Sequence, residues 1–319
     1  MDDFLRRLEN DGVVIPDQPV SIILDTDIGP DVDDVGALAL LHVCAHYRLC
    51  RILAVTHCTS SPYGVPCVHV INEAYRQADI PVGTLQAPNF LDAPEYRRFN
   101  EHLARKDINR TCCAPDATGL IIERLRKQPD NSVVLVAIGP LINLYNCLMA
   151  ENEHISCQDI RTLIKAKIRR TVIMGGAACG REWNFAMQPL ADRTDCSDWP
   201  APIVSSTFEI GASIISGRRW AGMPEDHPVR EAYRLHAPEG RPSWDLTAVW
   251  AAVFGYEPLY RLSGNGRMVV DLTGKSCWQE EKAGAHTCLQ KVWADEKIAE
   301  LLDNVISRDI FGVFPGSSI

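Results

Sequence analysis

A dense group of aspartates is the feature of this sequence most capable of chemistry. Five of them fall within ten residues, directly after the apolar run VSIIL: Asp25, Asp27, Asp31, Asp33 and Asp34. Carboxylates at this density repel one another unless positive charge lies between them. Hard dications such as Ca²⁺ bind several carboxylates together with carbonyl and water oxygens. Because Gly29-Pro30 predicts a sharp turn that folds the later aspartates back over the earlier ones, the segment predicts a metal site.

A purely structural role explains part of this cluster. Asp31 or Asp33 can cap a helix that begins near residue 33, and the dipole of that helix favours acidic residues in its first turn. Capping accounts for one or two aspartates and leaves the others unexplained, so we favour metal binding. His42 and His46 also have a metal-ligand spacing, but they lie in an apolar helical pattern with no third ligand nearby. That pattern favours ordinary core or surface histidines.

Short apolar segments typical of strands alternate with helical patterns along the chain. Strands are predicted at 20–25, 51–56, 81–84, 132–138, 171–176 and 202–206, and helices at 33–47, 65–78, 119–128, 139–150, 244–254 and 294–307. This order indicates an α/β fold with an open, mostly parallel (mixed) sheet, helices on both faces and a Rossmann-like core. Ligands of such sheets bind beyond the carboxyl ends of the strands, which is where the aspartates lie.

We expect residues 1–319 to form a single domain. Residues 1–18 are a polar N-terminal lead-in, and residues 86–116, rich in Pro, Asn and Arg, are predicted to be a surface excursion or lid. The last third of the chain changes character, since two β-like segments, GRMVVDL and HTCLQKV, separate its two predicted helices.

The composition excludes several classes of protein. A hydrophobic share of 46% is ample for a core, and the formal charge of −9 disfavours a nucleic-acid binder, which needs a basic surface. No apolar stretch approaches the roughly 18 residues of a membrane span, and the N-terminus lacks the apolar region of a secretion signal. The 12 cysteines include no C-x-x-C, and several lie in apolar runs, where a free thiol behaves as a small hydrophobic side chain, so we expect reduced core cysteines. We therefore expect a cytoplasmic protein that binds neither nucleic acid nor membrane.

The motif DTDIGPDVDDVGALAL closely resembles that of the inosine/uridine-preferring nucleoside hydrolases. Further motifs of that family follow in the same order: AIGPLIN at 137–143, MGG at 174–176, EWN at 182–184, and an aspartate, Asp245, at the start of a late helix. A second family, the phosphotransferases of the haloacid dehalogenase type, also has D-x-D after a strand. Its later G-D-x-x-x-D signature is missing here, so the resemblance to the nucleoside hydrolases is much the stronger.

The resemblance implies a nucleoside hydrolase-like fold and a Ca²⁺-dependent hydrolysis of an N-glycosidic bond by a metal-activated water. It implies that Asp27 is both metal ligand and proton acceptor, and that the metal shell is completed by Asp34, Asp245 and the main-chain carbonyl of Ile138. The implied substrate-binding residues are Asp33, Glu182, Trp183, Asn184 and Trp244. Asp25 and Asp31 are further candidates for binding or surrounding the metal. The implied partner is a small nucleoside or N-riboside, and the family commonly forms homo-oligomers, dimers or tetramers.

Three positions depart from the family pattern. Trp244 stands where purine-cleaving relatives often have a histidine that protonates the leaving base, and Gln188 stands where many members have an acid. The segment that contains Asp31 is also two residues longer than in the best-known members. We therefore expect an intact metal shell and a diverged base site.

Three functional hypotheses follow. The first is the Ca²⁺-dependent N-riboside hydrolase. The second is a ribose- or nucleoside-binding protein of the same fold that is catalytically weak or idle, which Trp244 and Gln188 suggest. The third is a phosphotransferase with Asp25 as its nucleophile, which the missing later motifs disfavour.

Overall fold

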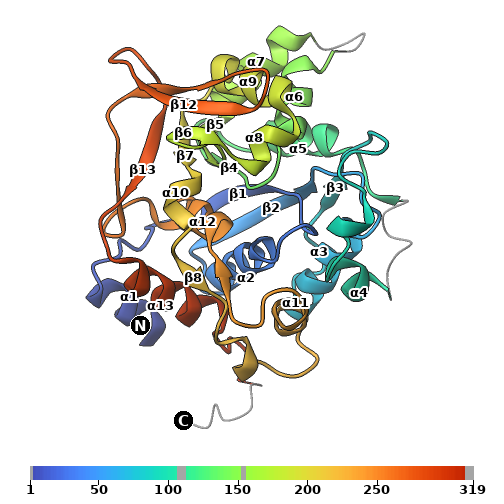
Figure 1. The fold of residues 1–319 in the computed structure, drawn as a ribbon, viewed down its shortest axis with the longest axis vertical. Coiled ribbons are helices and arrows are strands. Elements are labelled where there is room, and N and C mark those ends of the chain that lie inside the picture. The colour runs from blue at the N-terminus through green and yellow to red at the C-terminus, as the bar shows by residue number, and fades with distance from the viewer. Residues whose placement is uncertain (1–2, 106–112, 152–155, 313–319) are drawn as a thin grey trace.

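The computed structural model describes residues 3–105, 113–151 and 156–312 (Figure 1). Within them, one mixed sheet organises the fold. Its strand order is β10 (Tyr260–Leu262), β13 (Thr287–Lys291), β7 (Ile203–Ser206), β5 (Ile168–Met174), β4 (Val133–Ala137), β1 (Val20–Thr26), β2 (Cys50–His57) and β3 (Val82–Thr84). Neighbouring strands are parallel except β10, which pairs antiparallel with β13. The predicted fold class, a mostly parallel open sheet, is confirmed.

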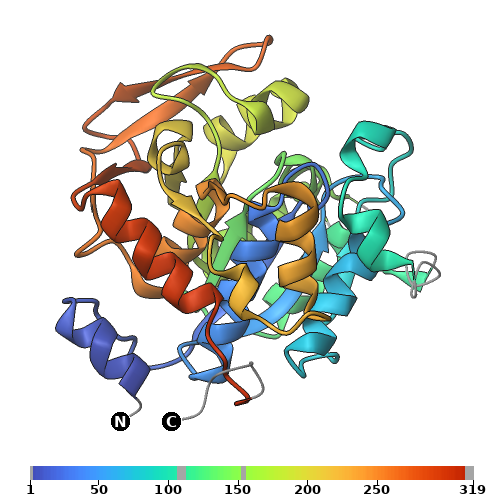
Figure 2. The same ribbon diagram turned by 60° about the horizontal axis from the view of Figure 1, so that its bottom comes forward.

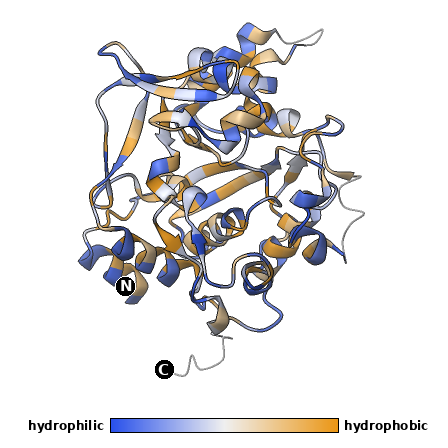
Figure 3. Ribbon diagram, viewed as in Figure 1, coloured by the Kyte–Doolittle hydropathy of each residue, from blue (hydrophilic) through white to orange (hydrophobic). Residues whose placement is uncertain are grey.

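Two hydrophobic clusters cover the two faces of this sheet because its central strands are apolar on both sides. In β1, Ile22 and Leu24 belong to one cluster and Ile23, which lies between them, to the other. The first cluster contains side chains of α1 (Asp3–Asn10), α2 (Asp33–His46), α3 (Gly64–Ala74), α11 (Pro228–His236), α12 (Trp244–Phe254) and α13 (Asp295–Ile306). The second contains side chains of α5 (Ala117–Arg126), α6 (Ile142–Met149), α7 (Cys157–Lys167), α8 (Trp183–Met187) and α9 (Pro189–Asp198). Figure 3 shows the apolar character of the central strands.

The order of the strands creates a crevice beyond their carboxyl ends. From β1 the chain proceeds through β2 to β3 at one edge, whereas β4, β5 and β7 lie in that order on the other side of β1. The direction of winding therefore reverses between β1 and β4, and ligands bind at such a switch point beyond the strand ends. Figures 1 and 2 show α12 beside α2, and both helices begin at the carboxyl ends of the strands.

Smaller elements complete the fold around this crevice. A three-stranded sheet has the order β11 (Gly266–Val270), β12 (Lys275–Glu280) and β6 (Cys179–Arg181), and a two-stranded sheet pairs β8 (Ile215–Ser216) with β9 (Arg241–Pro242). The short helices are η1 (Pro94–Tyr96), α4 (Asn100–Ala104), α10 (Phe208–Gly211) and η3 (Trp220–Gly222). Among the described helices, none is long and apolar enough to cross a membrane.

The two segments predicted to lie outside the core, 1–18 and 86–116, both contain helices. The polar lead-in 1–18 contains the amphipathic helix α1, which buries Phe4 and Leu8, with the ring of Phe4 4.6 Å from that of Tyr47. The predicted lid 86–116 contains η1 and α4, and its Phe99 is fully buried; residues 106–112 lie outside the described part of the chain.

The paired histidines of α2 have separate surroundings. His42 is buried, bonds through Nε2 to Oδ1 of Asn72 at 2.8 Å and stacks on Tyr75, and burial lowers its pKa to about 4. His46 is less buried and lies at the far end of the helix. The expectation that these two residues are not a metal pair agrees with this arrangement.

Trp250 of α12 offers a test of the core. Its side chain is fully buried against Phe254, with ring centroids 4.3 Å apart, and its Nε1 has no hydrogen-bond partner among the described residues. Trp250→Ala is expected to lower the free energy of unfolding by about 3–5 kcal/mol because it leaves a large cavity. Trp250→Phe is expected to cost much less, since it also removes the unpaired N–H. Denaturant titration measures both, with Leu272→Ala at an exposed site as the control; equal losses for the two variants would contradict this account.

Candidate active site

The carboxylates predicted from the acidic motif meet at the switch point between β1 and β4, beyond the carboxyl ends of the strands. Asp27 follows the end of β1, Asp33 and Asp34 form the first turn of α2, and Asp245 lies in the first turn of α12. All four side chains are buried, and all four line one cavity of about 380 Å³. Both helix dipoles direct their positive ends toward this cavity.

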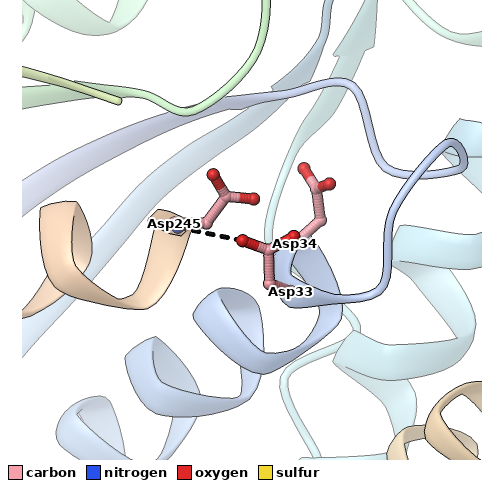
Figure 4. A group of neighbouring side chains, drawn as sticks. All are labelled: Asp33, Asp34 and Asp245. Atoms are coloured by element: carbon pink, nitrogen blue, oxygen red, sulfur yellow. Dashed lines mark hydrogen bonds between the residues drawn. The ribbon is translucent and has the colours of Figure 1, made fainter. Parts of the chain in front are cut away.

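Three of these side chains form a group with the spacing of a metal site. Asp33, Asp34 and Asp245 each offer one carboxylate oxygen, and these oxygens lie within 4.8 Å of one another (Figure 4). The backbone N–H of Asp245 donates to Oδ2 of Asp33 at 3.1 Å, so one Asp33 oxygen is occupied by the N-terminus of α12. The hydroxyl of Thr26 donates to Oδ1 of Asp34. The local capping role proposed for Asp33 is therefore wrong, because Asp33 accepts from α12 rather than from its own helix.

Burial and mutual repulsion disfavour the charged form of every member of this group. Burial, followed by the neighbouring charges of Asp31, Asp25 and Glu182, raises the pKa of Asp27 to about 7. Burial also raises the pKa values of Asp33, Asp34 and Asp245 well above their ordinary range, and the charges of the neighbouring aspartates add to this increase. A cation among these groups would reverse the effect of burial.

Asp31 is bound by two side chains, those of Arg241 and His236. Its carboxylate accepts from Nε of Arg241 at 2.8 and 2.9 Å, also accepts from Nη2 of that residue, and lies 3.3 Å from Nε2 of His236. Although burial acts in the opposite direction, the hydrogen bonds from His236 and Arg241 lower the pKa of Asp31. The bidentate pair links the loop after β1 to β9, which leads directly into α12. Asp31 thus fixes the relative positions of the two segments that carry the buried carboxylates.

Asp25 lies beneath the cavity and does not line it. Its Oδ1 accepts from the Thr56 hydroxyl at 2.5 Å and from Nδ2 of Asn143 at 2.8 Å, and its side chain has no exposed surface. Burial raises its pKa to about 7 in spite of these hydrogen bonds. A nucleophile needs access to its substrate, so this position argues against the phosphotransferase hypothesis.

Ile138 and the EWN motif complete the wall of the cavity nearest to Asp27. Ile138, Glu182, Trp183 and Asn184 all line it. The carboxylate of Glu182 accepts from the N–H groups of Gly176, Asn184 and Phe185 at 3.0, 2.7 and 3.2 Å, so it caps α8. Nδ2 of Asn184 donates to the carbonyls of Ile138 and Met174 at 3.2 and 3.0 Å. Asn184 therefore orients the Ile138 carbonyl, a contact that its sequence motif does not reveal.

Comparison with known proteins identifies the family. The family model described as "inosine-uridine preferring nucleoside hydrolase" matches residues 22–295, which include every cavity-lining residue discussed above. The chain belongs to this family. The predicted enzyme class, a hydrolase of N-glycosyl bonds, is confirmed by this membership. Among functionally curated proteins, no sequence matches.

Solved structures show the same fold at low sequence identity. A plant nucleoside hydrolase is 18% identical with a TM-score of 0.66, and the match covers 91% of this chain and 100% of that one. The inosine-uridine preferring nucleoside hydrolase of Bacillus anthracis is 17% identical with a TM-score of 0.68, over 90% and 99% of the two chains. The type III effector protein XopQ, solved with adenosine diphosphate ribose, is 15% identical with a TM-score of 0.65, over 95% and 97%.

Trp244, the residue that departs from the family motif, lies in one wall of the cavity. Trp244 stacks on Phe208, with ring centroids 5.5 Å apart at 28°, and its Nε1 donates to the Phe208 carbonyl at 2.9 Å. The guanidinium of Arg241 lies 5.4 Å from the Trp244 ring centroid. Trp244 consequently presents an aromatic surface to the cavity while its side-chain N–H is occupied.

Sequence reasoning missed several residues that line this nucleoside hydrolase cavity. These are Pro30, Glu95, Tyr96, Arg98, Met174, Arg181, Phe208 and Arg241. Some had a nearby signal: Arg181 directly precedes the EWN motif, and Tyr96 and Arg98 lie in the predicted lid. Arg241 had none, because its partner Asp31 lies 210 residues earlier in the chain.

Gly139 leaves room for the Asp27 carboxylate, and its substitution should disturb the site. A Cβ atom at position 139 would lie 2.8 Å from Oδ1 of Asp27 and 2.7 Å from Sγ of Cys58. Gly139→Ala is therefore expected to displace the Asp27 carboxylate and to lower kcat/KM for N-riboside hydrolysis by about 10- to 100-fold. Gly222→Ala is the matched control, because a Cβ atom at position 222 would meet nothing within 4 Å. Steady-state kinetics of both variants check this, and an unimpaired Gly139→Ala enzyme would show that Asp27 has room to move.

Proposed function

We propose that this protein hydrolyses the N-glycosidic bond of a ribonucleoside or related N-riboside with the help of a bound Ca²⁺. Family membership supports the reaction class. Asp27, Asp34, Asp245 and the carbonyl of Ile138 are the proposed metal ligands, and Asp33, Glu182, Trp183, Asn184 and Trp244 are the proposed surroundings of the substrate.

The observation that carries the metal proposal is a charge imbalance in the cavity. Asp27, Asp33, Asp34 and Asp245 are buried together, and none of them forms an ion pair with a cationic side chain among the described residues. Arg241 also lines the cavity, but its guanidinium is bound by Asp31. The charge of Arg241 acts on Asp33 from a distance, but four buried carboxylates without a direct ion pair are costly, whereas oxygen donors in this number suit Ca²⁺.

The donor set also fits the chemistry required. A bound dication supplies positive charge that offsets the carboxylates and lowers the pKa of water at the site. Asp27 is proposed to accept the proton that the attacking water loses, since its carboxylate lines the cavity together with the other buried aspartates. The space beside the Asp27 carboxylate is narrow, because a Cβ atom at position 139 would lie 2.8 Å from its Oδ1.

The proposed roles of the remaining residues follow from the atoms that they present to the cavity. Asp33 has one oxygen occupied by the N–H of Asp245, so its other oxygen is the one available to accept hydrogen bonds from ribose hydroxyls. The Phe208–Trp244 pair offers an aromatic face on which a base can stack. Trp183, 42% exposed, adds a further apolar wall.

A product assay tests this function. The purified protein is incubated with Ca²⁺ and a panel of purine and pyrimidine nucleosides, and the released base and reducing sugar are both quantified. Equal amounts of base and sugar, formed only when Ca²⁺ is present, are expected. Activity that persists after complete chelation of metal would contradict the metal proposal.

The second candidate is a nucleoside-binding protein with little or no catalysis. The occupied N–H of Trp244 favours it, because the side chain at the position of the family's proton donor has no proton to give. The same assay separates the two: binding of a nucleoside detected by calorimetry, with no base released, would support the binding protein.

A further inference from the structure

The acidic cavity has a cationic rim on one side. Arg98 and Arg181 both line it, and both side chains are exposed. Arg98 follows η1 and Arg181 ends β6, so the two come from segments that are distant in sequence. Tyr96 and Trp183, each two residues from one of these arginines, are in edge-to-face contact with ring centroids 5.6 Å apart. This contact brings the two segments, and with them the two arginines, to the same side of the cavity.

These two arginines have no structural role as ion-pair partners. Neither forms a salt bridge among the described residues, and the hydrogen bond that Arg98 makes is from its Nε to the main-chain carbonyl of Glu95 at 3.3 Å. Arg241, by contrast, is bound by Asp31. Glu95 also lines the rim, so its carboxylate offsets only one of the two cations.

A neutral nucleoside offers these arginines only uncharged acceptors, the hydroxyl and carbonyl oxygens. Its ribose hydroxyls suit the carboxylates and carbonyls of the cavity floor, and its base suits the aromatic pair Phe208–Trp244. Arginine is preferred where an oxyanion, above all a phosphate, must be held, because its guanidinium presents paired N–H donors.

We propose, building on the proposed hydrolase function, that the preferred substrate carries a phosphate on its ribose 5′-oxygen and that Arg98 and Arg181 bind this phosphate. Arg181 directly precedes Glu182, and Asn184 follows three residues after it; Glu182 and Asn184 are residues proposed to lie beside the sugar. In the reaction the bond between C1′ and the base nitrogen breaks, the water oxygen bonds to C1′, and the second product is ribose 5-phosphate. The departing base nitrogen gains a proton from solvent water, and the attacking water loses one to Asp27, which returns it to solvent, so one water is consumed for each bond cleaved.

Matched substrate pairs test this inference. Base release is measured for inosine against inosine 5′-monophosphate, adenosine against its monophosphate, and uridine against its monophosphate, each with Ca²⁺ at low ionic strength. The readout is the ratio of kcat/KM for the nucleotide to that for its nucleoside. We expect a ratio of about 10 or more in the wild type, equivalent to about 1.4 kcal/mol. The double variant Arg98→Gln/Arg181→Gln should bring the ratio close to 1.

Two further variants show whether the rim charge is responsible. Glu95→Gln removes the rim carboxylate and should raise the ratio, a change that loss of structure would not produce. Arg261→Gln, at an exposed arginine that does not line the cavity, should leave the ratio unchanged. A wild-type ratio near or below 1 while nucleosides are hydrolysed would overturn the phosphate inference and leave the proposed function standing.

Binding measurements separate this inference from the proposed function. The dissociation constants of inosine and its 5′-monophosphate are measured by calorimetry on the Asp27→Asn protein with Ca²⁺, where no turnover is expected. Tighter binding of the nucleotide that disappears in the arginine double variant supports the inference even if no substrate is hydrolysed by the wild type. Equal or weaker binding of the nucleotide overturns it.

Discussion

Asp27→Asn is expected to reduce kcat for N-riboside hydrolysis by about 10²- to 10⁴-fold, the contribution typical of a positioned general base. The substitution keeps the size and shape of the side chain but removes its ability to accept a proton and the negative charge that it offers as a proposed metal ligand, so the rates are measured at saturating Ca²⁺. Asp27 lines the cavity, is 5% exposed and has its pKa raised to about 7, chiefly by burial. Single-turnover and steady-state rates of base release at saturating substrate measure the loss.

Stability provides the control for this variant. Without a cation the wild type must bury the Asp27 charge or protonate the group, and asparagine removes that requirement. The cation-free Asp27→Asn protein is therefore expected to unfold at a temperature at least as high as that of the cation-free wild type. An inactive but less stable variant would mean that the side chain mainly supports the fold, and a fully active variant would refute the assignment of Asp27 as the base.

Removal of the cation is expected to have the second large effect: loss of hydrolysis together with a stability that depends on pH. In the cation-free protein the pKa of Asp27 is raised from 3.8 to about 7, and those of Asp33, Asp34 and Asp245 are raised well above the same starting value. Between about pH 4 and pH 7 the folded state thus holds protons that the unfolded state has released. The free energy of unfolding therefore falls as pH rises through this window.

Bound Ca²⁺ should raise the free energy of unfolding most at a pH where the buried aspartates have lost their protons. Because Ca²⁺ and protons compete for the same carboxylates, the increase in melting temperature on adding Ca²⁺ to chelated protein is expected to be larger at pH 8 than at pH 6. At a concentration 100 times the dissociation constant, the increase at pH 8 corresponds to about 2.7 kcal/mol, or roughly 4 °C for a chain of 319 residues. Differential scanning calorimetry in both buffers measures it.

The double variant Asp34→Asn/Asp245→Asn is the control for the calcium effect. It removes two of the four buried charges without changing side-chain size, so both the pH dependence and the response to Ca²⁺ should shrink. A calcium response that is the same at both pH values, or that survives in this double variant, would place the ion elsewhere.

The secondary structure was predictable where the pattern was local and strongly apolar. The predicted helix 244–254 matches α12 in full, and the predicted strand 20–25 differs from β1 by one residue. The prediction missed α7 because its sequence, CQDIRTLIKAK, is mostly polar. A signal was nevertheless present, since Ser156 and Asp159 form a capping box at its start.

The carboxylate site was predictable only in part. Asp27, Asp33 and Asp34 stand close together in sequence, so their proximity follows from chain connectivity, and ordered motifs pointed to Ile138, Glu182 and Asp245. Asp31 and Asp25 belong to the same motif, yet one binds Arg241 and the other lies beneath the cavity. Asn184 likewise belongs to a substrate motif but donates to two main-chain carbonyls.

The sequence by itself determined the local elements, the family and the location of the acidic site, because hydrophobic periodicity and motif order are recorded within short stretches of chain. Only the tertiary structure decided that Asp31 pairs with an arginine and that Asp33 accepts from the N-terminus of another helix. It also decided which arginines line the rim of the cavity. The partners of Asp31 and Asp33 come from segments that are distant in the chain and are brought together only when the sheet winds in two directions from β1. The charge of −9 counts all ionisable groups equally, whereas the fold separates them into paired, buried and exposed ones.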